Sequence, residues 1–253
     1  MQQLARFWGV ADNGEVMELA VRPHLVEQLI ERWPPVGMER YTEQVDPVVA
    51  QRGLSDDWII IPDRDPSGDN PPPEAWDQLE QTMTLFAVHR LTSMVAVHSA
   101  VLAHEGRAIL VPVHSGGGKS TLTMAAAEAG VKVLTDEYAL IDQVTGLVSG
   151  WRRPVRIRRE DGTTDRRNIA VDSDPIPVAL VAFVAHQPDD EPTWRSLSAA
   201  ELTGELLGHT ISARDRPHES FDAALAVART AKGIKGTRGN ATEAIHQLLA
   251  LLG

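Results

Sequence analysis

Residues 107–121, which read RAILVPVHSGGGKST, decide the fold of this chain. The apolar run at 107–113 predicts a buried strand, and the alanine-rich segment at 120–129 predicts a helix that Gly130 ends. Consecutive glycines lie between the two, and glycine allows backbone N–H groups to approach phosphate oxygens closely. A strand, a glycine turn and a helix N-terminus in this order predict a phosphate-binding loop.

The loop residues have distinct expected roles. Its members are His114, Ser115, Gly116, Gly117, Gly118, Lys119, Ser120 and Thr121. We expect the backbone to bind the phosphates of ATP, Lys119 to reach the β- and γ-phosphates, and the Ser120 hydroxyl to ligate Mg²⁺. His114 either contacts a phosphate or shapes the turn. The general pattern has glycine where this chain has Val113, and a glycine turn that only caps the helix is the alternative.

Two adjacent acids, Asp136 and Glu137, follow the next apolar run at 131–134. One carboxylate at a strand end can hold Mg²⁺, directly or through water, while the other accepts a proton from an attacking hydroxyl. A solvated turn is the alternative. His98 lies in the apolar run 95–102, where a lone histidine is by itself more typical of a core position.

The composition limits the classes of function. The 253 residues carry a net charge of −11, which argues against broad nucleic-acid binding because such binding uses a basic surface. The absence of cysteine excludes disulfides, cysteine-ligated metals and cysteine nucleophiles. With no long apolar segment and no signal-peptide pattern, the expectation is a cytoplasmic protein without a membrane partner.

Arginine is concentrated between residues 151 and 167. The cluster consists of Arg152, Arg153, Arg156, Arg158, Arg159, Arg166 and Arg167. Such a density in an acidic chain indicates either a local anion site or a solvated face that nearby acids neutralise. As an anion site, the arginines at 152–159 would bind an anionic acceptor through bidentate hydrogen bonds.

The pattern along the chain predicts two domains, a small α/β region at 1–70 and a nucleotide-binding domain at 71–253. Residues 62–73, rich in Asp, Pro and Gly, read as a loop or linker between them. Strands are expected at 4–10, 15–21, 58–61, 95–102, 107–113, 131–134, 139–142, 147–158 and 178–185. Helices are expected at 24–33, 74–92, 120–129, 198–208, 219–231 and 240–252, the last starting at Asn240.

Three features together resemble the HPr kinase/phosphorylase family, especially its shorter relatives. They are a histidine in an apolar strand, His98-Ser99-Ala100, then the phosphate loop Gly116-Gly117-Gly118-Lys119-Ser120-Thr121, then Asp136-Glu137. The order and the spacing are similar to those of the family. The resemblance covers residues 75–145 well and residues 233–252 loosely.

This resemblance implies an α/β fold with a mixed sheet, like the C-terminal domain of HPr kinase, and a core related to phosphoenolpyruvate carboxykinase. It also implies an ATP- and Mg²⁺-dependent kinase that phosphorylates a hydroxyl. By position, Asp136 is the general base and Glu137 a metal ligand or its neighbour. Ser120 also holds the metal, and His98 lies near the transferred phosphate.

The acceptor is left open by the resemblance. The short relatives act on small hydroxylated molecules or on serine in peptides, and an anionic acceptor fits the arginines. The family forms hexamers, so the resemblance also leaves open whether this protein is a homo-oligomer. Val113 and Glu137 depart from the usual glycine and aspartate. A nucleotide-binding sensor or assembly protein without transfer activity, and a phosphorylase or NTPase of the same fold, are therefore the alternative functions.

Overall fold

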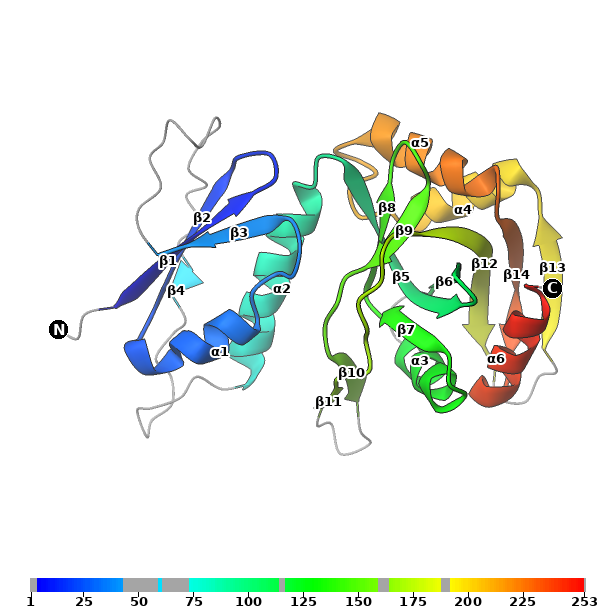
Figure 1. The fold of residues 1–253 in the computed structure, drawn as a ribbon, viewed down its shortest axis with the longest axis horizontal. Helices are drawn as coiled ribbons and strands as arrows, with labels where there is room; N and C mark the ends of the chain where they lie inside the picture. The colour runs from blue at the N-terminus through cyan, green and yellow to red at the C-terminus, as the bar shows by residue number, and fades with distance from the viewer. Residues whose placement is uncertain are drawn as a thin grey trace. The chain divides into compact units, whose positions relative to one another are not determined.

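The computed structural model describes residues 4–42, 59–60, 73–113, 117–158, 164–187 and 192–252. The chain divides into two compact units, one up to Thr92 and one from Ser93 (Figure 1). This division falls later than the boundary at 70/71 expected from the sequence. Helix α2 (Pro73–His89) belongs to the first unit because Arg32 of that unit lies over the Trp76 ring, 4.8 Å from its centroid.

The first unit contains a four-stranded sheet in the order β3-β1-β2-β4. Its elements are β1 (Ala5–Ala11), β2 (Val16–Val21), η1 (Pro23–Leu25), α1 (Val26–Glu31), β3 (Met38–Tyr41), β4 (Ile59–Ile60) and α2. The first two strands confirm the sequence prediction, and Gly14 takes the positive φ of 85° that their turn requires. Strand β3 was not predicted. Trp58, Ile61 and residues 62–72 of the linker predicted at 62–73 lie outside the described residues, and Pro73 begins α2.

An eight-stranded mixed sheet forms the centre of the second unit, with the main order β13-β14-β12-β6-β5-β8-β9 and β7 paired to β5. This confirms the predicted α/β class with a mixed sheet. The strands are β5 (Met94–His104), β6 (Arg107–Pro112), β7 (Lys132–Thr135), β8 (Tyr138–Asp142), β9 (Leu147–Gly150), β12 (Ile176–His186), β13 (Thr193–Leu197) and β14 (Lys232–Arg238). A separate hairpin consists of β10 (Val155–Arg158) and β11 (Thr164–Arg167).

Helices cover both faces of this sheet (Figure 1). The helices are α3 (Lys119–Glu128), α4 (Ala199–His209), α5 (Pro217–Ala228) and α6 (Ala241–Ala250). Side chains of β12 alternate between the two layers: Val181 and Phe183 pack with α4 and α5, whereas Ala182 and Val184 pack with α3 and α6. Burial on both faces explains why these strands read as continuous apolar runs.

The strand directions bring four chain segments to one edge of the sheet. Strand β12 is parallel to both β6 and β14, and β5 is antiparallel to both β6 and β7. Strands β6, β7, β12 and β14 therefore all end at the same edge. In open α/β sheets, ligands bind beyond the carboxyl ends of the strands, so this edge is where a site is expected.

The sequence prediction was wrong at several sheet positions. The single strand expected at 147–158 is interrupted at 151–154, where Pro154 has no N–H to donate to a ladder. Strands β11 and β13 were not predicted, because each is short and mostly polar. The three C-terminal helices are confirmed, and the Asn240 side chain accepts the N–H groups of Thr242 and Glu243. Among the described residues, no helix is long and apolar enough to cross a membrane.

Candidate functional site

Lys119 begins α3 and lies beside His98 of the neighbouring strand β5. The Nζ atom of Lys119 is 2.6 Å from Nε2 of His98. His98 is half-buried and pairs across the sheet with Tyr138 of β8, and the two rings lie 5.9 Å apart. The histidine is therefore not enclosed in the core, and its ring nitrogen is directed at the lysine that the sequence placed in the phosphate loop.

Ser120 and Asp136 form the second contact of the site. The Ser120 hydroxyl donates to Oδ2 of Asp136 at 3.2 Å. Asp136 follows β7 directly, at the shared edge of the sheet, and both side chains are half-buried. The fold thus brings together Lys119, His98, Ser120 and Asp136 from three separate elements. Their chemical roles stay predictions.

Thr135, a residue the sequence did not single out, fixes the turn that carries the two acids. Its buried hydroxyl donates to the Trp151 carbonyl at 2.8 Å. It also accepts the N–H groups of Glu137, at 3.0 Å, and Tyr138, at 3.4 Å. The Ser99 N–H donates to the Glu137 carbonyl at 3.1 Å, which ties the same turn to β5. Asp136 is consequently held on a rigid backbone.

Replacing Thr135 with valine tests this support. Thr135→Val keeps the shape but leaves the Trp151 carbonyl and the Glu137 N–H without their partner. We expect a loss of about 1–3 kcal/mol in the free energy of unfolding and a larger fall in kcat than in ATP affinity. Denaturant unfolding and steady-state kinetics measure both. Thr135→Ser keeps the hydroxyl and serves as the control; equal kcat values in the two variants would show that Thr135 does not position the acids.

Burial shifts the pKa values of Lys119 and Asp136. It lowers the pKa of Lys119 to about 8, although the charges of Asp136 and Glu137 raise that pKa. It raises the pKa of the Asp136 carboxyl, and the Ser120 hydrogen bond and the Lys119 charge act in the opposite direction. A carboxylate whose pKa is raised by burial is a better proton acceptor than one in water.

The nucleotide binding predicted from the sequence should therefore depend on pH. Lys119 is charged below its pKa of about 8 and neutral above it, and phosphate oxygens attract only the charged form. As the pH rises through about 8, we expect ATP affinity without added metal to fall, by up to about tenfold per pH unit. Calorimetric titrations across this range measure the effect. Lys119→Met should bind weakly with no such slope, and an equal slope in that variant would assign the titration to another group.

Glu137 affects the site through its charge, and Tyr138 through its ring packing. Tyr138 is buried, which raises its pKa, and the neighbouring Glu137 charge raises it further. Its ring packs edge-on against the fully buried Trp151, with centroids 6.0 Å apart. Glu137 is half-buried, and its charge acts on both Lys119 and Tyr138. Its carboxylate thus lies near the site, as the pair of acids predicts.

The oxygen donors at this edge fit Mg²⁺. No group of three His, Asp or Glu side chains within the described residues is arranged to hold a metal ion by protein ligands alone. Magnesium in phosphoryl-transfer sites instead uses one or two carboxylates together with substrate phosphates and water. Ser120 and Asp136, 3.2 Å apart, supply a hydroxyl and a half-buried carboxylate of this kind.

Arg238 holds the last part of the predicted phosphate loop. It ends β14 and is only 2% exposed, and its Nη2 donates to the Gly118 carbonyl at 2.9 Å. Gly118 has φ 78°, and a Cβ atom there would overlap Nη2 of Arg238. Both facts require glycine at 118. Gly117 comes directly before Gly118, and Thr121 lies in the first turn of α3, whereas His114, Ser115 and Gly116 lie outside the described residues.

The arginine cluster does not act as one group. Arg152 forms an exposed ion pair with Asp172 at 2.7 Å, and Arg167 pairs with Asp165 at 2.8 Å, as the solvated-face alternative predicts. Arg153 is buried against the Trp151 ring, and the charge of Arg156 lowers the pKa of Asp136. Arg166 lies opposite Arg156 in the hairpin; Arg159 and the side chain of Arg158 are outside the described part.

Comparison with known proteins gives a distant structural similarity. No protein-family model matches the sequence, and no curated protein matches it either. The chain is similar to the structure of the Hpr(Ser) kinase/phosphatase from Coxiella burnetii. The TM-score is 0.37 and the identity 13%, and the match covers 62% of this chain and 87% of that one. The similarity is distant.

Proposed function

We propose that this protein is an ATP- and Mg²⁺-dependent kinase that transfers the γ-phosphoryl group to a hydroxyl of a small molecule or of a peptide serine. One observation carries the proposal: at the start of α3, Lys119 meets His98 and Ser120 meets Asp136. The sequence resemblance to the HPr kinase/phosphorylase family supports the same reaction, because the matching residues are those in these two contacts.

The reaction needs positioning and charge more than covalent chemistry. The bond between the γ-phosphorus and the β–γ bridging oxygen breaks, the acceptor oxygen bonds to the phosphorus, and ADP leaves. Asp136 accepts the proton of the acceptor hydroxyl, which its raised pKa favours. Lys119 stabilises negative charge on the transferred group, and His98, 2.6 Å from it, orients the ammonium. Bound Mg²⁺ would neutralise charge on the phosphate oxygens.

The charges around Asp136 favour an anionic acceptor. The Arg156 charge lowers the pKa of both Tyr138 and Asp136, whereas Arg153, which is buried against the Trp151 ring, lowers that of Tyr138. An acceptor hydroxyl that approaches Asp136 therefore meets positive charge. A carboxylate or phosphate on the acceptor would complement it.

Product analysis tests the proposed reaction. With Mg²⁺, ATP and a panel of hydroxylated carboxylates, phosphorylated sugars and serine peptides, we expect one acceptor to gain a phosphate and ADP to form in equal amount. Mass spectrometry and nucleotide chromatography measure the two products. ATP turnover that no acceptor changes would indicate an NTPase instead, and ATP binding without any product would indicate a nucleotide sensor.

A further inference from the structure

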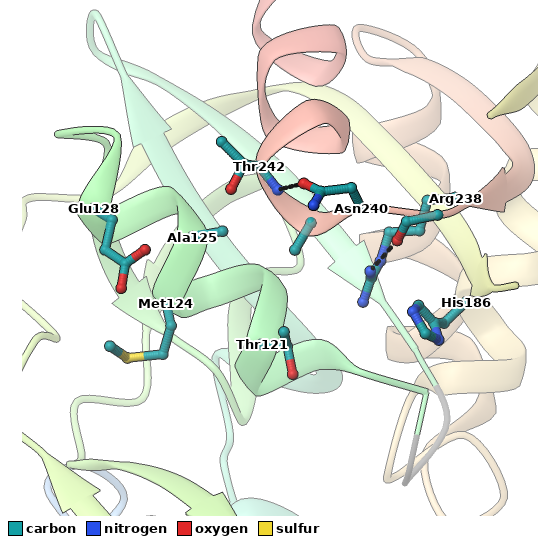
Figure 2. A pocket seen from close by; sticks show the side chains of 10 residues that line it. Thr121, Met124, Ala125, Glu128, His186, Arg238, Asn240 and Thr242 are labelled. Carbon is teal, nitrogen blue, oxygen red and sulfur yellow. Dashed lines mark hydrogen bonds between the residues drawn. The ribbon is translucent and has the colours of Figure 1, made fainter. Parts of the chain in front are cut away.

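A pocket lies against the face of α3 that carries Thr121, Ala125 and Glu128. It has a volume of about 410 Å³ and runs between α3 and the turn that joins β14 to α6 (Figure 2). Small-molecule sites commonly have volumes of about 300–1,000 Å³. The lining residues named in Figure 2 are Thr121, Met124, Ala125, Glu128, His186, Arg238, Asn240 and Thr242.

The pocket and the contact between Ser120 and Asp136 use different positions on α3. Thr121, Met124, Ala125 and Glu128 stand at i, i+3, i+4 and i+7, so they form one face of the helix. Ser120 is turned by about 100° from Thr121 and bonds Asp136 instead. The centre of the pocket face is therefore about a quarter of a turn from Ser120, and Met124, four residues after Ser120, lies between the two sites.

The pocket is continuous with the phosphate loop. Two of its wall residues, Arg238 and His186, end the neighbouring parallel strands β14 and β12. Arg238 bonds the Gly118 carbonyl at 2.9 Å, and a Cβ atom on Gly118 would lie 3.9 Å from Cβ of His186. A molecule bound to the loop can consequently extend into the pocket without crossing the protein core.

We infer that this pocket binds the nucleoside half of the nucleotide whose phosphates bind the loop. The inference rests on the proposed function, which puts the γ-phosphate beside Asp136. A triphosphate laid across the start of α3 from Asp136 would bring its other end to the pocket, which Thr121 and Arg238 border.

The side chains of the pocket suit a nucleoside. Met124 and Ala125 offer apolar contact to a base. Thr121 and Thr242 offer hydroxyls, and the exposed Glu128 carboxylate accepts hydrogen bonds from ribose or base donors. The Glu128 carboxylate would also repel an anionic acceptor from this pocket.

Blocking the pocket tests the inference with two ligands. Thr242→Trp and Met124→Trp fill it from opposite walls without changing Lys119, Ser120 or Asp136. We expect each variant to raise the Kd for ATP at least about tenfold and to leave the Kd for inorganic tripolyphosphate unchanged. Calorimetric titration of the full chain measures both values. His246→Trp, on an exposed part of α6 outside the pocket, is the matched control and should bind both ligands normally.

Each other outcome overturns the inference in a distinguishable way. If the variants bind ATP as the wild type does, the nucleoside lies elsewhere, although the phosphate loop stands. If they lose ATP and tripolyphosphate equally, the pocket supports only the phosphates. If the wild type binds neither ligand, the phosphate-loop function itself is wrong, and the nucleoside site fails with it.

Discussion

Lys119→Met will abolish phosphoryl transfer while the fold survives. In the proposed mechanism the ammonium is the charged group that the loop presents to the γ-phosphate, so its removal should lower kcat/KM by at least about 10²–10³-fold. Stability should not fall, because burial already lowers the pKa of Lys119 to about 8, so the charged form carries a desolvation cost. Methionine keeps the apolar stem of the side chain in place.

Two measurements separate chemistry from folding in this variant. Thermal unfolding should give a Tm equal to or above that of the wild type, while the transfer assay loses its signal. A variant with normal stability and near-normal turnover would remove Lys119 from the mechanism. His98 would then have to be reassigned as well, because its expected role depends on the contact at 2.6 Å.

Asp136→Asn will keep ATP binding and lose transfer. The amide keeps the size of the side chain and can still accept the Ser120 hydroxyl, but it cannot take a proton from the acceptor. Loss of a general base typically lowers kcat by about 10²–10⁴-fold. The Kd for ATP, measured without Mg²⁺ so that metal binding does not contribute, should change by only a few fold, because the carboxylate does not bind the nucleoside or the loop backbone.

The control for this variant is Asp222→Asn, a similar change at an exposed position of α5 on the other face of the sheet. It should leave kcat and the Kd for ATP unaltered. Asp136→Asn with a kcat close to that of Asp222→Asn would contradict the assignment of Asp136 as general base. The proton acceptor would then have to be another group at the sheet edge, with Glu137 the first to test.

The parts of the site that follow directly from local sequence could be predicted. The apolar run at 107–113 gives β6, the glycines permit the turn at Gly118, and α3 follows at Lys119. The acids at the end of β7 could be placed for the same reason, since a buried strand delivers the residue after it to the sheet edge.

The supporting residues could not be predicted, because their partners are distant in sequence. Arg238 bonds the Gly118 carbonyl across 120 positions, and nothing near Arg238 in the chain marks that contact. Thr135 is one residue from Asp136, yet its role depends on the Trp151 carbonyl, which approaches only after β8 and β9 pair. The arginine density likewise did not reveal that Arg152 pairs with Asp172 while the charge of Arg156 lowers the pKa of Asp136.

The most direct test of the account follows a labelled γ-phosphate. Wild type and Asp136→Asn are incubated with Mg²⁺, ATP labelled in the γ-phosphate and a fractionated mixture of small hydroxylated metabolites and serine peptides. Mass spectrometry then locates the label. We predict that the wild type places it in a phosphate ester, with one ADP formed per ester, and that Asp136→Asn forms almost none. Label found only as inorganic phosphate, or in the same ester at the same rate in both proteins, would contradict a hydroxyl kinase centred on Lys119 and Asp136.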